Sequence, residues 1–268
     1  MNKICKFYLK NNCKQGNKCS YIHSNDICKN YFFDGNCKRE NKCKFKHTET
    51  VFRNKPKNTE NFEPSHKPSD MNILIGDSNN IYKNKYAEND VIIIPNFLKE
   101  NVNNEYYNKL LKEIEESDID NLKLWKLWHG DNHLIADDNL NWKEKIPTFT
   151  YILSEIEKYF DIEIKNTRLN LYKDSSDWKP FHHDAAAVKK HIAEIQNFTI
   201  GISLGSTRDI AFESIKDKTV VSIPLLNCTV YAFAKDININ WKHGIPQIHP
   251  DKSFSDGRIS IICWGKII

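Results

Sequence analysis

Two stretches near the start of the chain place three cysteines and one histidine at spacings that suit metal binding. The first contains Cys5, Cys13, Cys19 and His23, and the second contains Cys28, Cys37, Cys43 and His47. Three thiolates and one imidazole at short spacings form a closed tetrahedral site for structural Zn²⁺. Because so small a unit cannot bury a core, metal binding must supply its folding free energy. We therefore expect two structural zinc ions.

A third stretch, "DWKPFHHDAAA" at 177–187, contains two adjacent histidines and an aspartate. It is compatible with a metal site or with an ordinary polar turn before a small-residue segment. On a strand, side chains alternate, so His182 and Asp184 would share one face while His183 would point away. One imidazole and one carboxylate supply two ligands of the facial triad of non-haem Fe(II), which needs a third ligand.

Three histidines further along the chain are candidates for the third ligand. His191 lies in a charged, helix-like run, and His249 lies in a proline-flanked loop. His243 follows a strand-like run and lies fifteen residues before the apolar run at 258–265. On the residues alone, all three histidines remain candidates. Arg258, which begins that last run, could bind a dicarboxylate cosubstrate through two parallel hydrogen bonds.

The use of cysteine indicates a reducing compartment. Six of the eight cysteines precede residue 44, whereas Cys228 and Cys263 lie far apart in apolar runs. The first residues lack the continuous apolar stretch of a secretory signal, and no stretch reaches the roughly 18 apolar residues of a membrane span. We therefore expect an intracellular protein, cytoplasmic or nuclear and without membrane association, whose clustered cysteines bind metal instead of forming disulfides.

Charge is divided unevenly along the chain. Residues 1–70 carry 15 Lys/Arg against 7 Asp/Glu, whereas the remainder carries 24 against 28. A basic head on a mildly acidic body predicts that the head binds a polyanion.

The intervening residues predict the elements that position these side chains. Residues 50–72 are rich in proline and polar residues without periodicity, which predicts a flexible linker. A buried strand is expected in "DVIIIPNF" at 90–97. Amphipathic helices are expected within 98–117 and from Pro147 to 160. Their apolar faces would be Tyr106, Leu110 and Ile114 in the first, and Ile152, Ile156 and Phe160 in the second.

Apolar runs of strand length follow Thr167. They occupy 168–172, 197–205, 210–214, 219–224, 229–234 and 258–265. Helices followed by several short strands predict an α+β fold, in which a sandwich or barrel is supported by helices on one side.

The two cysteine–histidine stretches resemble tandem CCCH zinc fingers over residues 3–47. Aromatic residues follow the first cysteine in "CKFY" and "CKNYFF", and another lies between the last cysteine and the histidine in "CSYIH" and "CKFKH". In that family such aromatics stack on bases of single-stranded RNA while cations accompany them. The implied RNA-contacting residues are Phe7, Tyr8, Tyr21, Tyr31, Phe32, Phe33 and Phe45, with Lys6, Lys18, Lys29, Lys42, Lys44 and Lys46. The alternative is that several of these aromatics only cover the zinc.

In the body, the order of HxD, distant histidine and arginine on a strand resembles that of 2-oxoglutarate/Fe(II) dioxygenases. The segments "NTRLNLYKDSSDWKPFHHD", "GISLGSTRDIAFE" and "WKHGIP" narrow the resemblance to the AlkB-like branch, over roughly residues 90–265. It implies a double-stranded β-helix (jelly-roll) core at about 164–268 with N-terminal supporting helices. The implied domains are zinc fingers at 1–25 and 26–49, a linker at 50–72 and a dioxygenase domain at 73–268.

The resemblance also implies roles for single residues. His182, Asp184 and His243 would ligate Fe(II). Arg258 and Tyr172 would bind the far carboxylate of 2-oxoglutarate. Asn170 would contact the keto-acid end of the same cosubstrate.

The chain departs from the family at two positions on its last strand. Trp264 stands where a second arginine is usual, and Ser260 stands where asparagine is common. Both departures weaken the expectation of typical cosubstrate geometry. Upstream, Trp125 or Trp128 lies in the segment that corresponds to the family's lid and is a candidate platform for a flipped base, or else a core residue.

The expected function is oxidative demethylation of N-methylated bases in single-stranded nucleic acid, RNA more than DNA, by a protein that needs Fe(II), 2-oxoglutarate and two zinc ions. One alternative is an RNA-binding protein whose oxygenase fold is catalytically silent, because of Trp264 and Ser260. Another is a protein hydroxylase that the fingers localise to ribonucleoprotein. A monomer is favoured, although the sequence does not define the oligomeric state.

Overall fold

The computed structural model describes residues 4–34, 37–47, 60, 68, 70–100, 103–127, 132–249 and 256–267, except for the side chains of Lys6, Asp34 and Glu40. The chain forms two compact units, Met1–Lys57 and Asn58–Ile268, which we call the head and the body. Most of the predicted linker at 50–72 lies outside the described residues. Within the described ranges, the structure contains no helix with the length and apolar character required to cross a membrane.

The head consists of two similar small modules. Each has a short α-helix after its first cysteine and a 3₁₀ helix before its third: α1 (Lys6–Leu9) and η1 (Gly16–Lys18), then α2 (Lys29–Asp34) and η2 (Glu40–Lys42). The buried apolar residues are Leu9, Ile27 and Phe32, with Ile4 and Phe33 packed against them. So small a cluster cannot by itself offset the conformational entropy of ordering the head.

The four potential ligands of each module lie close together. In each set of three cysteines and one histidine, one donor atom per residue lies within 4.8 Å of the others. The backbone N–H of Tyr8 donates to the Cys5 Sγ over 3.4 Å. A backbone hydrogen bond from Arg39 is the main reason that the pKa of the Cys37 thiol is lowered to about 7. Both contacts stabilise thiolate, the form that binds zinc.

The body contains an eight-stranded sheet and a four-stranded sheet. The large sheet has the order β1 (Asn72–Ile75), β2 (Asp90–Ile94), β10 (Thr229–Ala234), β7 (Phe198–Gly205), β12 (Arg258–Lys266), β5 (Glu163–Tyr172), β4 (Leu134–Ala136), β3 (Trp125–Leu127). The small sheet has the order β6 (Lys179–His182), β11 (Trp241–Ile245), β8 (Arg208–Ser214), β9 (Val220–Leu225). Neighbouring strands are antiparallel except for the parallel pair β1 and β2.

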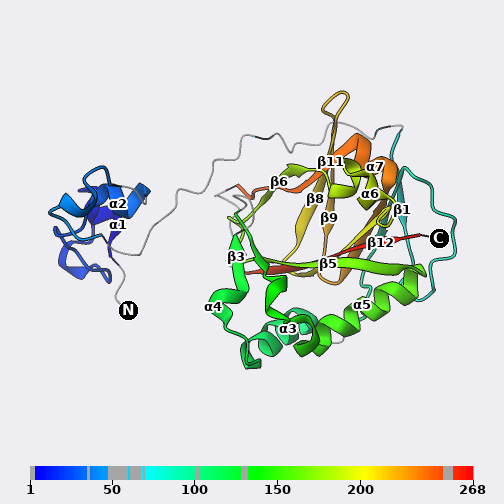
Figure 1. Cartoon of the computed structure of the whole chain (residues 1–268), viewed down its shortest axis with the longest axis horizontal. Coiled ribbons are helices and arrows are strands. Elements are labelled where there is room, and N and C mark those ends of the chain that lie inside the picture. The colour runs from blue at the N-terminus through cyan, green and yellow to red at the C-terminus, as the bar shows by residue number, and fades with distance from the viewer. Residues whose placement is uncertain are drawn as a thin grey trace. The chain divides into compact units, whose positions relative to one another are not determined.

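Helices cover one face of the large sheet, and the small sheet faces the other (Figure 1). The two main helices are α3 (Glu105–Glu116) and α5 (Pro147–Phe160). The shorter helices are α4 (Asn121–Leu124), α6 (Lys190–Ala193), α7 (Lys235–Asn240), η3 (Asp138–Leu140), η4 (Lys143–Lys145) and η5 (Ala185–Ala187). Proline at the first position of α5 suits a helix start, because that residue needs no hydrogen-bonded N–H.

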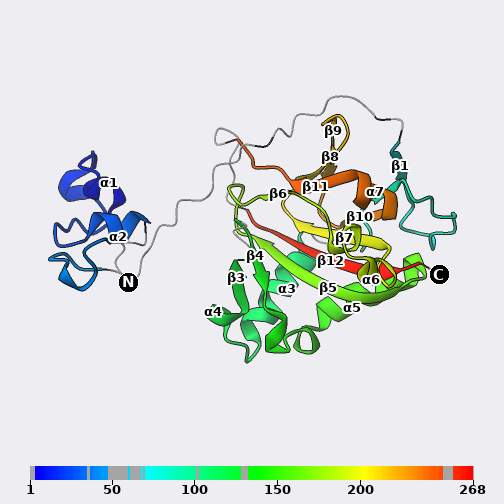
Figure 2. The same ribbon diagram turned by 45° about the horizontal axis from the view of Figure 1, so that its top comes forward.

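Side chains alternate between the two faces of the large sheet, so each face packs into a different hydrophobic core. On β12, Ile259, Ile261 and Cys263 are fully buried in the core that includes α3 and α5. The intervening residues face the small sheet, toward a second core that includes Phe212 and Trp241. Figure 2 shows β5, β12, β7 and β10 lying side by side as the layer that separates these cores. A period of two therefore lets one sheet pack against helices and also line a site.

The predicted helices and the six later strands are confirmed with small shifts at their ends. Leu110 and Ile114 are buried on α3, and Ile152, Ile156 and Phe160 are buried on α5, as expected. The sheet is larger than predicted, because β1 to β4 join it from before residue 164. The result is a mixed α+β body whose two facing sheets are consistent with a jelly-roll-like core.

The buried His133 contacts two residues of β5, Asn170 and Tyr172, which alternate onto the same face of the strand. His133 is fully buried, its ring stacks on Tyr172 at 4.7 Å, and its Nε2 lies 3.2 Å from the Asn170 Oδ1. Burial, with a further contribution from the charge of Lys179, lowers the pKa of His133 to about 3. The imidazole is therefore neutral in the folded protein at ordinary pH.

The buried imidazole makes the stability of the metal-free body depend on pH. His133 has a folded-state pKa of about 3 and an unfolded-state pKa of about 6.5, so the unfolded chain binds an extra proton between these values. The free energy of unfolding should therefore fall as pH drops below 6.5, by up to about 1.4 kcal/mol per pH unit for this residue. All six tryptophans lie beyond residue 124, so urea unfolding followed by tryptophan fluorescence reports on the body. His133→Gln should have a shallower slope than the wild type, and equal slopes would contradict a neutral buried His133.

Chelation of zinc should unfold the head and leave the body folded. A structural zinc contributes about 10–16 kcal/mol of apparent binding free energy, which the small apolar cluster of the head cannot replace. Amide hydrogen exchange in residues 4–34 and 37–47 should accelerate after chelation, while tryptophan fluorescence stays unchanged. Cys43→Ser should lower the zinc content from two ions to one, whereas Cys263→Ala, in the body, should leave two. A zinc-free head that keeps its protected amides would contradict this account.

Candidate metal centre

His182, Asp184 and His243 converge on one point in the body. His182 ends β6, His243 lies on β11, and the two residues are paired directly across these antiparallel strands. Donor atoms of the three residues lie within 4.8 Å of one another. The His243 Nε2 is 3.7 Å from the Asp184 Oδ1, which is inside the roughly 4.2 Å that two metal–ligand bonds of about 2.1 Å can span.

Contacts outside the cluster orient two of these side chains. The His182 Nδ1 lies 3.0 Å from the Pro180 carbonyl, which makes Nδ1 the donor and leaves Nε2 available to a metal. The Asp184 Oδ2 accepts a 2.9 Å hydrogen bond from the Thr199 hydroxyl, and the Asp184 N–H donates to the Asn238 Oδ1 over 2.9 Å. Both side chains are thereby held in position before a metal binds.

His183 points away from the cluster, as the alternation argument predicts. Its Nδ1 lies 2.6 Å from the Asn238 carbonyl of α7. Asn238 therefore orients both halves of the sequence "HD", one through its carbonyl and the other through its side chain.

Both imidazoles of the cluster are neutral at ordinary pH. Burial lowers the pKa of His243 to about 4, although the neighbouring Asp184 acts in the opposite direction. Burial, followed by the charges of Lys179 and His243, lowers the pKa of His182 well below its usual value. A neutral imidazole is the form that ligates metal, so little proton release accompanies binding.

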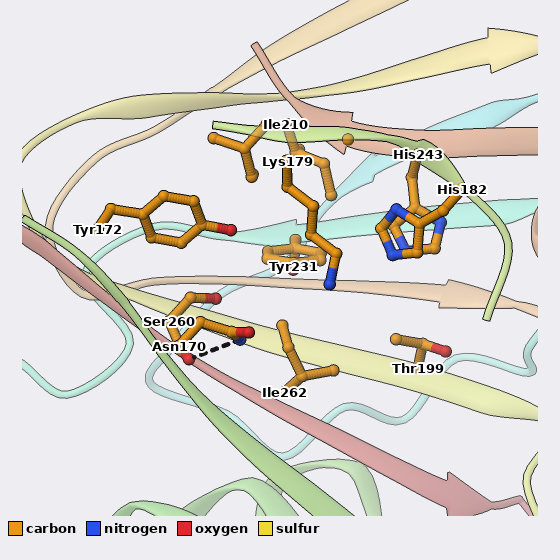
Figure 3. A pocket seen from close by; sticks show the side chains of 12 residues that line it. Asn170, Tyr172, Lys179, His182, Thr199, Ile210, Tyr231, His243, Ser260 and Ile262 are labelled. Atoms are coloured by element: carbon orange, nitrogen blue, oxygen red, sulfur yellow. Dashed lines mark hydrogen bonds between the residues drawn. The ribbon is translucent and has the colours of Figure 1, made fainter. Parts of the chain in front are cut away.

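An inner cavity extends from the cluster between the two sheets (Figure 3). Asn170, Tyr172 and Ser260 line it from the large sheet, and His182 and His243 line it from the small sheet. The Asn170 side-chain amide donates to the Ser260 carbonyl over 3.1 Å. The two positions at which the sequence departs from the resembled family lie on the same strand. Ser260 lines the inner cavity, and Trp264 lies further along β12.

Tyr231 also reaches this cavity from β10. Its register partner on β7 is Gly201, and a Cβ at that position would overlap the Tyr231 ring. The glycine in "FTIGISLG" therefore allows the tyrosine to lie across the sheet.

Arg258 is buried beside the far end of the cavity. It is 1% exposed, and its guanidinium lies 5.0 Å from the centre of the Tyr172 ring, which lines the cavity. Its Nε donates to the Ser203 hydroxyl over 2.7 Å, whereas Nη1 and Nη2 have no hydrogen-bond partner among the described residues. A buried cation with two unused donors is costly unless a ligand supplies an acceptor, and a carboxylate matches its geometry.

An outer cavity of about 480 Å³ opens on the other side of the cluster. His182 and Asp184 form part of its wall, together with Trp264, Arg168 and Lys179. The Arg168 guanidinium lies 5.5 Å from the centre of the Trp264 ring, and the indole Nε1 is buried without a hydrogen-bond partner in the described part of the chain. This cavity joins an aromatic surface to positive charge next to the potential metal ligands.

The remaining sequence candidates are the platform tryptophans and the two other histidines considered as a third ligand. Trp125, a candidate platform, is partly buried against the helix-side core and lines neither the inner nor the outer cavity, which favours its alternative as a core residue. Trp128 lies outside the described residues. His191 and His249 are exposed and lie outside the cluster, which contains His243 instead.

Sequence reasoning missed Thr199, Tyr231, Lys179 and His133. Thr199 and Tyr231 lie in apolar strand runs, and the period of two on β7 and β10 would have placed both on the cavity face. Lys179 could not be found in this way, because a local irregularity in β6 determines where it points.

In the head, the aromatic residues separate into three groups. Phe7, Tyr21 and Phe45 are 54%, 51% and 47% exposed. Tyr8 and Tyr31 stack on the potential ligands His23 and His47, each at 4.2 Å.

Phe32 is fully buried, and Phe33 packs against it. The prediction that Phe32 stacks on a base is wrong, because no face of its ring reaches solvent. Phe7 and Tyr21, by contrast, line a surface cavity of the first finger beside Lys14.

The donor set of the body cluster fits a divalent transition metal. The imidazoles of two adjacent strands and the carboxylate that follows β6 would occupy one face of an octahedral ion and leave its other positions open. The unused guanidinium donors of Arg258 fit a carboxylate ligand.

No protein-family model matches the chain, and no curated protein matches its sequence. Among solved structures, that of OsALKBH1 is similar with a TM-score of 0.31 and 19% sequence identity. The similarity covers 38% of this chain and 50% of the OsALKBH1 chain, so the matched region spans half of that protein. At this level of similarity we assign no family to the chain.

Proposed function

We propose that the body is an Fe(II)/2-oxoglutarate-dependent dioxygenase that oxidatively demethylates N-methylated bases in single-stranded nucleic acid, RNA more than DNA. The observation that carries this proposal is the cluster of His182, Asp184 and His243 beside a cavity whose wall, Tyr172, contacts the buried Arg258. A metal-binding cluster at one end and a cation with unused donors at the other suit a metal-chelating dicarboxylate.

The protein's own part in this reaction is to bind, orient and exclude water. When bound, iron and 2-oxoglutarate supply the oxidising chemistry, which consumes O₂ and converts 2-oxoglutarate to succinate and CO₂. Hydroxylation of an N-methyl group then yields an N-hydroxymethyl group that releases formaldehyde. Thr199 and Asn238 hold Asp184, and His133 holds Asn170, so the ligand set and the cavity wall are preorganised.

The outer cavity supports a flat, anionic substrate. Trp264 offers an aromatic surface on which a base could stack, and Arg168 offers positive charge for the adjoining phosphates. In this proposal Trp264 takes the platform role that the sequence suggested for Trp125 or Trp128.

The head would deliver the nucleic acid. Its exposed aromatics Phe7, Tyr21 and Phe45 suit stacking on unpaired bases. Its excess of positive charge suits the phosphate backbone.

The first test is turnover by the full-length protein with Fe(II), 2-oxoglutarate and N-methylated RNA oligonucleotides. Succinate and formaldehyde should form in equal amounts. His182→Ala should lower both by at least about 100-fold, because removing a ligand costs more than the 10–100-fold loss seen for supporting residues. The exposed His191 provides the matched control, and His191→Ala should turn over normally. Absence of both products with every methylated oligonucleotide would contradict the proposal.

The second test concerns the platform residue. Trp264→Ala should raise the KM for the oligonucleotide by about 5- to 150-fold, because base stacking contributes about 1–3 kcal/mol. Trp264→Phe should keep most of the affinity, and both variants should bind 2-oxoglutarate as the wild type does in calorimetry of the Mn²⁺-loaded protein. An unchanged KM for Trp264→Ala would remove this residue from the substrate site.

A catalytically silent oxygenase fold is the second candidate, and the inner cavity favours it. With Lys179 in the observed position, the inner cavity measures about 30 Å³, which on the scale where one water needs about 10–15 Å³ holds two or three water molecules. Calorimetry of the Mn²⁺-loaded protein that shows RNA binding but no 2-oxoglutarate binding would support the silent protein. Hydroxylated peptide without formaldehyde would instead identify a protein hydroxylase.

A further inference from the structure

Lys179 is the first residue of β6, three residues before His182, and its side chain reaches both cavities of the site. Figure 3 shows this side chain entering the inner cavity from β6, with its ammonium directed toward the strands of the large sheet. Nothing in the motif "WKPFHHD" indicates this, because residues three apart on a regular strand face opposite sides.

An irregularity in the pairing of β6 with β11 explains the direction of Lys179. Three residue steps on β6, from Lys179 to His182, lie opposite two steps on β11, from Ile245 to His243. The extra residue is a β-bulge, which re-aims a side chain. Lys179 and His182 therefore both line the inner cavity.

Contacts on the other side of β6 confirm this arrangement. Phe181 is buried away from the cavity, against Ala211 and Val220. Its backbone N–H donates to both carboxylate oxygens of Glu60, over 2.9 and 3.0 Å. Glu60, which lies outside the small sheet, thus stabilises the bulge.

Charged groups lie both in the wall of the inner cavity and beside it, where the Asp184 carboxylate is 3.7 Å from the Nε2 of the lining residue His243. Lys179 is among its lining residues, and no aspartate or glutamate of the described chain is among them. Behind the Tyr172 wall lies Arg258, whose Nη1 and Nη2 have no partner among the described residues. The cavity face of β12 continues from Arg258 through Ser260 and Ile262 to Trp264, and Arg258 is the one cation among these four residues.

The small sheet supplies two further cations. Arg208 is buried near Tyr172 and donates to the carbonyls of Asp177 and Pro246, whereas Lys179 lines the cavity itself. We propose that Lys179 binds the carboxylate at the metal end of a 2-oxo dicarboxylate, while Arg258 binds the carboxylate at the far end. This inference rests on the proposed function, and it assigns a cosubstrate-binding role to a residue on the opposite sheet from Arg258. The small volume of the cavity requires the lysine to change rotamer as the ligand enters, which its flexible four-carbon stem permits.

Calorimetry of the Mn²⁺-loaded, full-length protein tests the proposal with two ligands. 2-Oxoglutarate has both carboxylates, whereas 2-oxovalerate keeps the 2-oxo acid and the chain length but lacks the far carboxylate. Lys179→Met should weaken both ligands by about 10- to 150-fold, the range for hydrogen bonds to charged groups. Arg258→Met should weaken 2-oxoglutarate alone, to the level of 2-oxovalerate.

Two further variants separate a binding role from a structural one. Lys179→Arg keeps the cation and should recover part of the lost affinity. Lys242→Met removes a lysine beside His243 that alternates to the other face of β11, and it should bind both ligands as the wild type does. Lys179→Met should also bind Mn²⁺ more tightly, because a nearby positive charge is gone, whereas a misfolded variant would bind it more weakly.

Three results would overturn the proposal. Unchanged affinities in Lys179→Met would show that the ammonium does not contact the ligand. If Lys179→Met loses 2-oxoglutarate binding but still binds 2-oxovalerate, Lys179 contacts the far carboxylate instead. In both cases the wild type still binds 2-oxoglutarate and the proposed function stands, whereas a wild type that binds neither ligand would overturn the proposed function as well.

Discussion

The pairing of β6 with β11 is the constraint on which the candidate site depends. It sets His182 directly opposite His243, and the turn after β6 brings in Asp184. Gathering two imidazoles and a carboxylate in a pocket shielded from water is costly unless each polar group has a partner. Here Pro180 and Thr199 supply partners for the outward atoms of His182 and Asp184, whereas the His243 Nδ1 is buried without a hydrogen-bond partner among the described residues. The small sheet therefore carries the histidines, and the large sheet supports the carboxylate.

The large sheet meets two requirements with alternate residues. One face buries Ile259, Ile261 and Cys263 against helices and supplies apolar burial, at about 25 cal/mol per Å². The other face carries Arg258 and Ser260, which stabilise little by themselves. Polar residues on that face are tolerated because the helix-side core holds the strands in register.

Much of this arrangement could be predicted from the sequence, because period-two and period-3.6 patterns determine which face is buried. The convergence of His182, Asp184 and His243 followed from alternation and from the order of motifs along the chain. The direction of Lys179 could not be predicted, since one extra residue in a strand reverses the facing of its neighbours. The burial of Phe32 was missed for a related reason: in a module with so few apolar residues, an aromatic can serve either the core or the surface.

X-ray absorption at the iron edge of the full-length protein, loaded with one equivalent of Fe(II) after the head is filled with zinc, tests the central claim most directly. The account predicts a first shell of nitrogen and oxygen at about 2.0–2.2 Å, with the outer-shell scattering of two imidazoles. In His243→Ala, half of that imidazole scattering should disappear. A first shell dominated by sulfur would place the iron in the head, and a shell without imidazole scattering would contradict a centre built from His182 and His243.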